Sequence, residues 1–75
     1  MNMKQAKKAI KAHYRDWLGL ELDITDEQAL AEIDNLKRRG RDVFGLDNLS
    51  GLFYRLLKAG VMSYEDLDGT GTGGQ

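Results

Sequence analysis

The sequence predicts an all-α protein: a small bundle of three main helices, with a short C-terminal helix and a flexible Gly-rich tail. Three observations support this prediction. Apolar residues recur three and four positions apart over long segments, which is the spacing of one face of an α-helix. Each segment is bounded by residues that typically start or end helices. No segment shows the sustained alternation of apolar and polar residues that indicates a strand.

The first helix is expected to span residues 2–18. Gly19 follows it, and glycine is the usual residue where a helix ends in the left-handed conformation. A basic stripe on a second face has the same spacing and consists of Lys4, Lys8, Lys11 and Arg15. The apolar stripe consists of Met3, Ala6, Ile10, Tyr14 and Trp17.

The second helix is expected to begin after Thr25 and to reach about Arg39. Thr25 and Gln28 have the spacing of a capping box, in which each side chain accepts a hydrogen bond from the backbone of the other residue. Gly40 is well suited to the position after the helix. The residues predicted to be buried are Ala29, Leu30, Ile33 and Leu36.

The following segment, residues 41–48, predicts a helical turn or a compact loop. Gly45 argues against a long regular element at this point. Three residues of the segment are apolar and are expected to pack: Val43, Phe44 and Leu46.

A third helix is expected next, with Asp47 or Ser50 as its cap and Gly60 at its end. Its apolar residues recur at i, i+3, i+4, i+7 and i+8, which defines one inward face. These residues are Leu49, Leu52, Phe53, Leu56 and Leu57.

A last helical turn is expected over residues 64–67, because Ser63 and Asp66 have the spacing of a second capping box. The residues after it contain no apolar anchor and are expected to be flexible. The sequence therefore predicts a single helical domain, residues 1–68, and a flexible tail, residues 69–75.

The composition limits the class of protein. A chain of 75 residues has room for one small domain. It contains no Cys, so no disulfide or thiolate metal cage is expected. No apolar run approaches the roughly 18 residues that a membrane span needs. We therefore expect a soluble, cytoplasmic protein with no membrane partner.

The chain is not expected to be an enzyme. Its single histidine, His13, has no Cys partner and no nearby carboxylate at metal-ligand spacing, and we expect it to be exposed or half-buried. The hydroxyls of Thr25, Ser50 and Ser63 are explained as helix caps. No catalytic residue, metal site or cofactor is predicted.

Charges occur in blocks although the net charge is only −1. Residues 1–18 contain five basic residues and one acidic residue, whereas residues 19–36 contain six acidic residues and no basic one. The favoured interpretation is that these blocks neutralise one another in the fold. The alternative is a surface that binds acidic protein or nucleic acid. The predicted basic surface consists of Lys4, Lys8, Lys11, Arg15, Lys37, Arg38, Arg39 and Arg41.

Six aromatic residues are many for so small a core. Most of them are expected to pack in the core or at its boundary. Tyr and Arg are also the residue types that dominate protein interfaces. We therefore predict a partner-binding face on the outward side of the third helix and beside it, formed by Tyr54, Arg55, Lys58 and Tyr64.

The segment LDNLSGLFYRLLKAGVMSYEDL, residues 46–67, resembles the first helix-hairpin portion of the C-terminal domain of the bacterial RNA polymerase α subunit, a helix-hairpin-helix relative. The shared features are a Leu-x-x-Leu start, a helix closing in Leu-Leu-Lys-Ala-Gly-Val, and a Ser-started helix ending in Glu-Asp-Leu. The resemblance implies similar helix packing. DNA binding does not follow from it, because the DNA-contacting Arg of that family falls close to Gly51 and its later phosphate-binding hairpin is replaced by the tail.

These observations together predict a small interaction module that occupies a surface on a larger protein as a regulator, adaptor or inhibitor. Its size and Cys-free composition are similar to those of accessory proteins of phages and mobile elements. The alternative is a nucleic-acid-binding module that uses the basic stripe of the first helix and the cluster KRRGR, residues 37–41.

Overall fold

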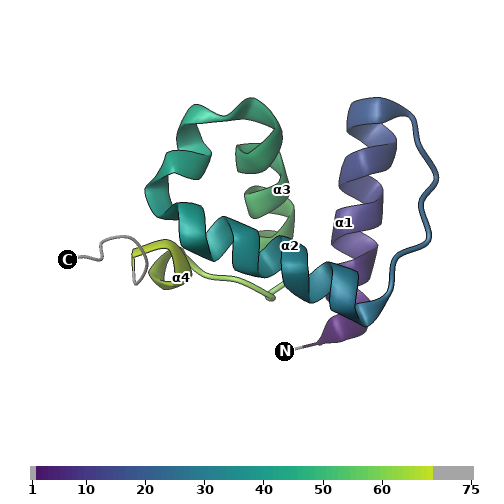
Figure 1. Ribbon diagram of the computed structural model, residues 1–75, viewed down its shortest axis with the longest axis horizontal. Helices are drawn as coiled ribbons and strands as arrows, with labels where there is room; N and C mark the ends of the chain where they lie inside the picture. The colour runs from purple at the N-terminus through teal and green to yellow at the C-terminus, as the bar shows by residue number, and fades with distance from the viewer. Residues whose placement is uncertain (1, 69–75) are drawn as a thin grey trace.

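A computed structural model describes residues 2–68 and confirms the predicted all-α class (Figure 1). This part of the chain contains four α-helices, one 3-10 helix and no strand. The predicted tail, residues 69–75, lies outside the described residues. The elements in chain order are α1 (Met3–Leu18), α2 (Asp26–Arg39), η1 (Gly40–Gly45), α3 (Asp47–Lys58) and α4 (Tyr64–Asp68).

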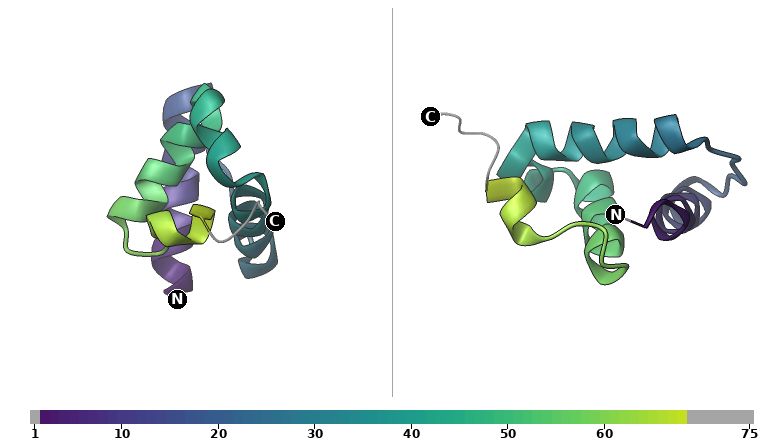
Figure 2. Two further views of the ribbon diagram at one scale, coloured as in Figure 1. Left: turned by 90° about the vertical axis from the view of Figure 1, so that its left-hand side faces the viewer. Right: turned by 90° about the horizontal axis from the view of Figure 1, so that it is seen from below.

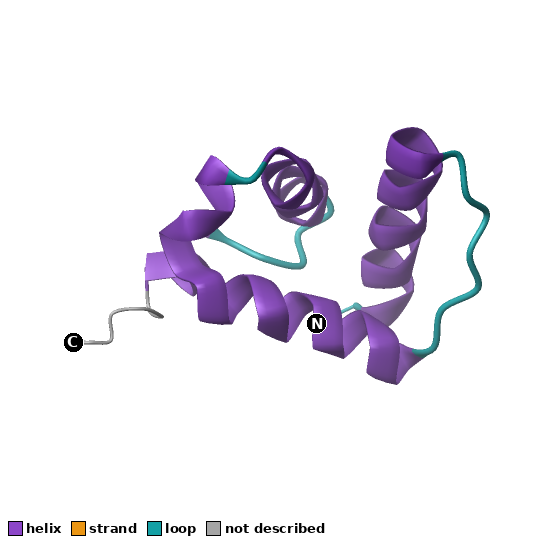
Figure 3. Cartoon of the chain, turned by 45° about the horizontal axis from the view of Figure 1, so that its top comes forward, coloured by secondary structure: helices purple, strands orange, loops and turns teal. Residues whose placement is uncertain are grey.

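The helices α1 and α3 lie side by side and run in opposite directions, and α2 crosses both of them (Figure 1 and Figure 2). The contact of α1 with α3 is more extensive than its contact with α2, although α2 is its neighbour in the chain. The short helix α4 packs against both α2 and η1. Residues 19–25 form an extended connection along the outside of the molecule (Figure 3).

One hydrophobic core lies between these elements, and every element contributes to it. Fully burying a side chain of this kind stabilises a fold by about 1.5–3 kcal/mol, so the core is the main stabilising feature of the domain. The largest fully buried side chains are Phe53, Ile10, Ile33, Leu36, Leu52, Leu56, Leu67 and Val43.

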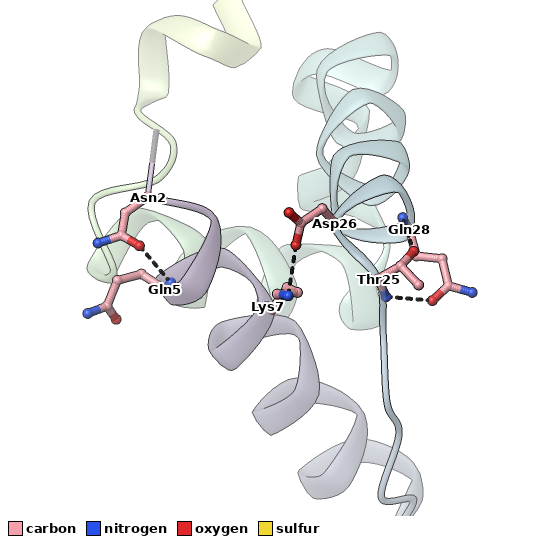
Figure 4. Close-up of polar contacts among 6 residues, drawn as sticks. All are labelled: Asn2, Gln5, Lys7, Thr25, Asp26 and Gln28. Atoms are coloured by element: carbon pink, nitrogen blue, oxygen red, sulfur yellow. Dashed lines mark hydrogen bonds and ion pairs between the residues drawn. The ribbon is translucent and has the colours of Figure 1, made fainter.

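The ends of α1 are those expected from its sequence. Asn2 caps the helix, because its side-chain oxygen accepts a hydrogen bond of 3.2 Å from the backbone N–H of Gln5 (Figure 4). Gly19 adopts φ 70°, and its N–H donates to the Arg15 carbonyl over 2.9 Å. Trp17, the last residue of the predicted apolar stripe, has a side chain that is 49% exposed and lies outside the core. The ring stacks on His13 in the last part of the helix, which leaves its other face open.

The start of α2 confirms the predicted capping box (Figure 4). The Thr25 hydroxyl accepts a hydrogen bond from Gln28 N–H over 3.1 Å, and the Gln28 side chain accepts one from Thr25 N–H over 2.9 Å. The prediction that Leu30 is buried was wrong, because its side chain is 43% exposed. Leu30 follows the buried Ala29, and one residue turns an α-helix by about 100°, which takes Leu30 off the inward face.

The segment between α2 and α3 is the 3-10 helix η1, which confirms the predicted helical turn. Gly40 is buried at the junction and adopts φ 59°, a conformation that favours glycine. Val43 is buried as predicted, whereas Phe44 and Leu46 keep exposed side chains. Phe44 directly follows the buried Val43, and Leu46 lies just after η1 at the start of α3.

The predicted cap of α3 was wrong. The cap residue is Leu46, and neither Asp47 nor Ser50 accepts a capping hydrogen bond at this end. The Ser50 hydroxyl instead donates to the Asp47 carbonyl over 3.0 Å, because Ser50 lies inside the first turn of the helix.

The turn between α3 and α4 is closed by backbone hydrogen bonds. Gly60 adopts φ 77°, and the N–H groups of Gly60 and Val61 donate to the carbonyls of Leu57 and Leu56, each over 3.0 Å. This pair of bonds is a Schellman motif, which confirms the predicted helix end. The backbone N–H of Ser63, the next predicted cap, donates to Asp66 Oδ2 over 2.8 Å.

Candidate functional site

Three aromatic side chains from three different elements form one exposed surface. Phe44 lies in η1, Tyr54 in α3 and Tyr64 in α4, with exposed fractions of 43%, 48% and 52%. Their ring centroids lie 5.8, 5.8 and 5.5 Å from that of Phe53, which is fully buried. Phe44 and Tyr54 also contact each other, with 6.1 Å between centroids. We call Phe44, Tyr54 and Tyr64 the aromatic surface.

A hollow of about 320 Å³ lies beside the aromatic surface. It is lined by Phe44 and Tyr64, by the buried Leu67, and by the exposed Arg41. This volume is at the lower end of the range for small-molecule sites, about 300–1,000 Å³. The hollow is therefore of a size to accept one apolar side chain of another protein.

The four residues predicted as a partner-binding face occupy two separate regions. Tyr54 and Tyr64 both pack on Phe53 and belong to the aromatic surface. Arg55 lies on the side of α3 that faces α1, where its guanidinium forms an ion pair with Asp16. Lys58 lines a hollow between α3 and α1 together with Arg55.

Part of the basic stripe of α1 is neutralised by neighbouring carboxylates. Lys11 Nζ lies 3.9 Å from Asp23 in the connection after α1, and Arg15 lies 3.9 Å from Asp16. Lys4 and Lys8, by contrast, form no ion pair with any residue between 2 and 68. Asp16 belongs to the same block as Arg15, so the predicted neutralisation between blocks is present in the stripe at Lys11 and absent, within the described chain, at Lys4 and Lys8.

Lys7 lies outside the stripe and joins α1 to α2. Its Nζ is 2.7 Å from Asp26 Oδ1 at the start of α2 (Figure 4). This is the pairing of a basic and an acidic block that the sequence suggested.

The second basic cluster, residues 37–41, is divided among different surroundings. Lys37 Nζ lies 4.0 Å from Asp66 Oδ1 of α4. Arg38 lines a hollow between α1 and α2, whereas Arg41 lies in η1 beside the aromatic surface. Arg39 is exposed at the end of α2. The side chains of this cluster therefore have different neighbours.

The histidine is more buried than the sequence suggested. His13 is only 6% exposed, and its ring stacks on Trp17 and meets Tyr14 edge-on. Burial lowers its pKa below the ordinary value of 6.5, and the charge of Arg55 lowers it further. The expectation of an exposed or half-buried side chain was wrong, because α1 turns this position toward α3.

Gly51 of α3 faces the same ring. A Cβ at this position would lie 3.5 Å from His13 Cε1. Gly51 is therefore directed at α1 and is not displayed on the outside of α3.

The hollow between α1 and α2 that Arg38 lines has a volume of about 450 Å³. Its lining includes Ile10, Leu22 and Ile24, with Tyr14 and Glu32 among its polar residues. The Tyr14 hydroxyl donates a hydrogen bond to Glu32 Oε2 across this junction. These two polar groups satisfy each other.

Two structural features are absent from residues 2–68. No group of three or more His, Asp or Glu side chains in that range is arranged to hold a metal ion. None of its helices is both long enough and apolar enough to cross a lipid bilayer.

Comparison with known proteins gives no relative. No protein-family model matches the chain, and neither the curated proteins nor the solved structures contain a match.

Phe44 is the member of the aromatic surface that the sequence did not indicate. Its apolar character and its neighbour Val43 suggested packing in the interior. The signal available was Gly45, which predicts a short element, and in that element Val43 is buried whereas Phe44 is 43% exposed.

Proposed function

We propose that this protein is a small, non-enzymatic module that binds another protein through the aromatic surface of Phe44, Tyr54 and Tyr64. One observation carries the proposal: the three exposed rings, from three elements, are all supported by the buried Phe53. Tyr is among the residue types that contribute most to binding energy at interfaces. Rings already held in position lose less conformational entropy when a partner binds.

The adjoining hollow indicates the chemistry of the partner. Its apolar lining of Phe44, Tyr64 and Leu67 is suited to an aliphatic or aromatic side chain that projects from the partner surface. Such an anchor would bury its apolar area among the rings, which is the arrangement found at the centre of tight interfaces.

A module of this kind would act as a regulator, adaptor or inhibitor of the larger protein. We place it in the cytoplasm, as an accessory protein of a phage or mobile element. The absence of a catalytic role is part of the same proposal, and it is supported by the position of His13, which packs between α1 and α3 and makes ring contacts.

The second candidate is a nucleic-acid-binding module that uses the basic stripe and residues 37–41. It is favoured by Lys4 and Lys8, which have no ion pair within residues 2–68. Two observations favour protein binding instead. The second cluster is divided among several surroundings, and the net charge is −1, whereas nucleic-acid-binding domains are usually strongly basic.

The test is photo-crosslinking in native lysate from a benzophenone amino acid placed at Tyr54, with the same group at Leu30 as control. Leu30 is exposed to a similar degree but lies on α2, outside the aromatic surface. We expect one partner to crosslink from position 54 only. The purified partner should then bind the variant Tyr54→Ser/Tyr64→Ser at least about thirtyfold more weakly than the wild type.

Two results would contradict the proposal. One is equal binding of the purified partner to the wild type and to the double variant, with Leu30→Ser as the control for an added surface hydroxyl. The other is crosslinking of the same proteins from both positions. Circular dichroism establishes that each variant is folded, which is expected because both tyrosine side chains are about half exposed.

A further inference from the structure

Two hollows, each of about 480 Å³, flank the basic stripe of α1. The first lies between α1 and the connection after it, and it brings together five cations with one carboxylate: Lys4, Lys7, Lys8, Lys11, Arg15 and Glu21. The second lies between α1 and α3, and its cations are Lys8, Arg55 and Lys58. Lys8 lines both hollows, so they form one continuous basic face.

Three lysines of this basic face form no ion pair with another residue of the described chain. Lys7 and Lys11 form ion pairs with Asp26 and Asp23, and Arg15 and Arg55 both form ion pairs with Asp16. The remaining ones, Lys4, Lys8 and Lys58, are exposed and have no ion pair with any residue of the described chain, 2–68. Their amino groups are therefore available to another molecule.

The floor of the second hollow is apolar. The methyl groups of Ala9, Ala12 and Ala59 line it, and no carboxylate is among the described residues of its lining. Small side chains allow another chain to approach the backbone closely, while the surrounding lysines favour negative charge. Along α1, the stripe from Lys4 to Arg15 extends about 16 Å, which equals about three turns of a partner helix.

We infer that this basic face is a second binding site, which takes an acidic segment of a partner protein. Carboxylates of the segment would pair with Lys4, Lys8 and Lys58, and a small apolar side chain would lie on the alanine floor. This site is distinct from the aromatic surface. The inference goes beyond the proposed function and does not require that the aromatic surface bind anything.

An acidic protein segment fits this face better than a nucleic acid does. No aromatic ring is among the described residues that line either hollow, so bases would have nothing on which to stack. Glu21 lines the first hollow, where its carboxylate disfavours a polyphosphate backbone that passes through it. Individual carboxylates can be placed to avoid Glu21, whereas a continuous phosphate backbone cannot.

The test is a fluorescence anisotropy titration with a labelled helical peptide of about 16 residues, in which Glu residues repeat at the four- and three-residue spacing of the stripe. A peptide with Gln at those positions is the uncharged control. Single-stranded and duplex oligonucleotides of similar length are titrated in parallel. We expect the Glu peptide to bind, the Gln peptide not to bind, and the affinity to fall as salt rises from about 50 to about 300 mM.

The variant Lys4→Gln/Lys8→Gln/Lys58→Gln should bind the Glu peptide about tenfold more weakly than the wild type. The variant Lys37→Gln/Arg38→Gln/Arg39→Gln has the same change in net charge at another place, and it should bind almost as the wild type does. Tyr54→Ser/Tyr64→Ser should also bind the peptide normally, which separates this site from the aromatic surface.

Four results would overturn the inference: equal weakening in both triple variants, no binding of the Glu peptide, tighter binding of an oligonucleotide than of the peptide, or occupation of the basic face by a second copy of this chain. The last is measured by light scattering of the wild type and of the first triple variant. Circular dichroism of each variant confirms that it is folded.

Discussion

The hydroxyl of Tyr14 in α1 donates a hydrogen bond of 2.5 Å to Glu32 Oε2 in α2. Burial and this hydrogen bond raise the pKa of Tyr14 from 10.0 to about 12. The contact links two helices that are adjacent in the chain but share less contact surface than α1 and α3 do. Tyr14 therefore acts as a polar connection at the weaker of the two helix contacts that α1 makes.

The first prediction concerns alkaline pH. Between about pH 10 and pH 12 the folded state holds the Tyr14 proton more tightly than the unfolded state does, so the stability from this group is complete below pH 10 and is lost as pH rises toward 12. Tyr14→Phe should lower the free energy of unfolding by about 1 kcal/mol at pH 7 and reduce its fall above pH 10. Urea unfolding from pH 7 to 11 measures both effects. Tyr64→Phe, outside the α1–α2 contact, is the control and should not reduce the alkaline fall.

The second prediction concerns acid pH. Because burial lowers the pKa of His13 below 6.5, the unfolded state binds a proton that the folded state resists. Stability should therefore fall as pH decreases from 7.5 through 6.5 toward 5.5, a range above the ordinary pKa values of carboxyl groups. His13→Gln should unfold with a flatter dependence on pH over that range. If the free energy of unfolding of the wild type and of the variant fell equally steeply over this pH range, protonation of His13 would not be the cause.

The third prediction concerns the left-handed end of α3. Gly60 adopts φ 77°, so Gly60→Ala should lower the free energy of unfolding by about 1–2 kcal/mol. Gly45 is the matched control, because its φ is not positive and a Cβ there would meet nothing within 4 Å. Gly45→Ala should leave the free energy of unfolding equal or slightly higher. Thermal unfolding of the two variants checks the difference, and equal destabilisation would count against the assigned strain.

The fourth prediction distinguishes a real cap from an apparent one. The Thr25 hydroxyl caps α2, whereas the Ser50 hydroxyl donates to a carbonyl inside α3. Thr25→Ala should lower the free energy of unfolding by about 1 kcal/mol, and Ser50→Ala should lower it by less. Urea unfolding at neutral pH is sufficient. A larger effect of Ser50→Ala would contradict the assignment of the caps.

The helices and most of their ends could be predicted from the sequence, because these features are local. Gly19, Gly60 and the pair Thr25 and Gln28 determine ends within one or two turns of chain. The exposure of Trp17 and Leu30 could not be predicted in the same way. Whether a residue at the edge of an apolar stripe is covered depends on where the neighbouring helix lies, and that depends on the whole fold.

The candidate site was predictable only in part, for the same reason. Tyr54 and Tyr64 were chosen as residue types common at interfaces, and the fold places both on Phe53. Arg55 follows Tyr54 in the sequence but faces α1, because one residue turns the helix by about 100°. Phe44 belongs to the surface because the chain turns at Gly40 and brings η1 against α3. This placement depends on tertiary structure and not on the local sequence.

The extended connection of residues 19–25 has a practical consequence. It joins α1 to the rest of the domain, yet α1 is held in place by its packing on α3 and by the pairs Lys7–Asp26 and Arg55–Asp16. The contacts that hold α1 in place are therefore different from the covalent connection through residues 19–25. A protease that cuts the connection would leave a nicked protein with both pieces in place. For the same reason, a peptide of residues 1–19 would bind a fragment that contains the other helices and would restore the fold, so the peptide would be usable as a small tag.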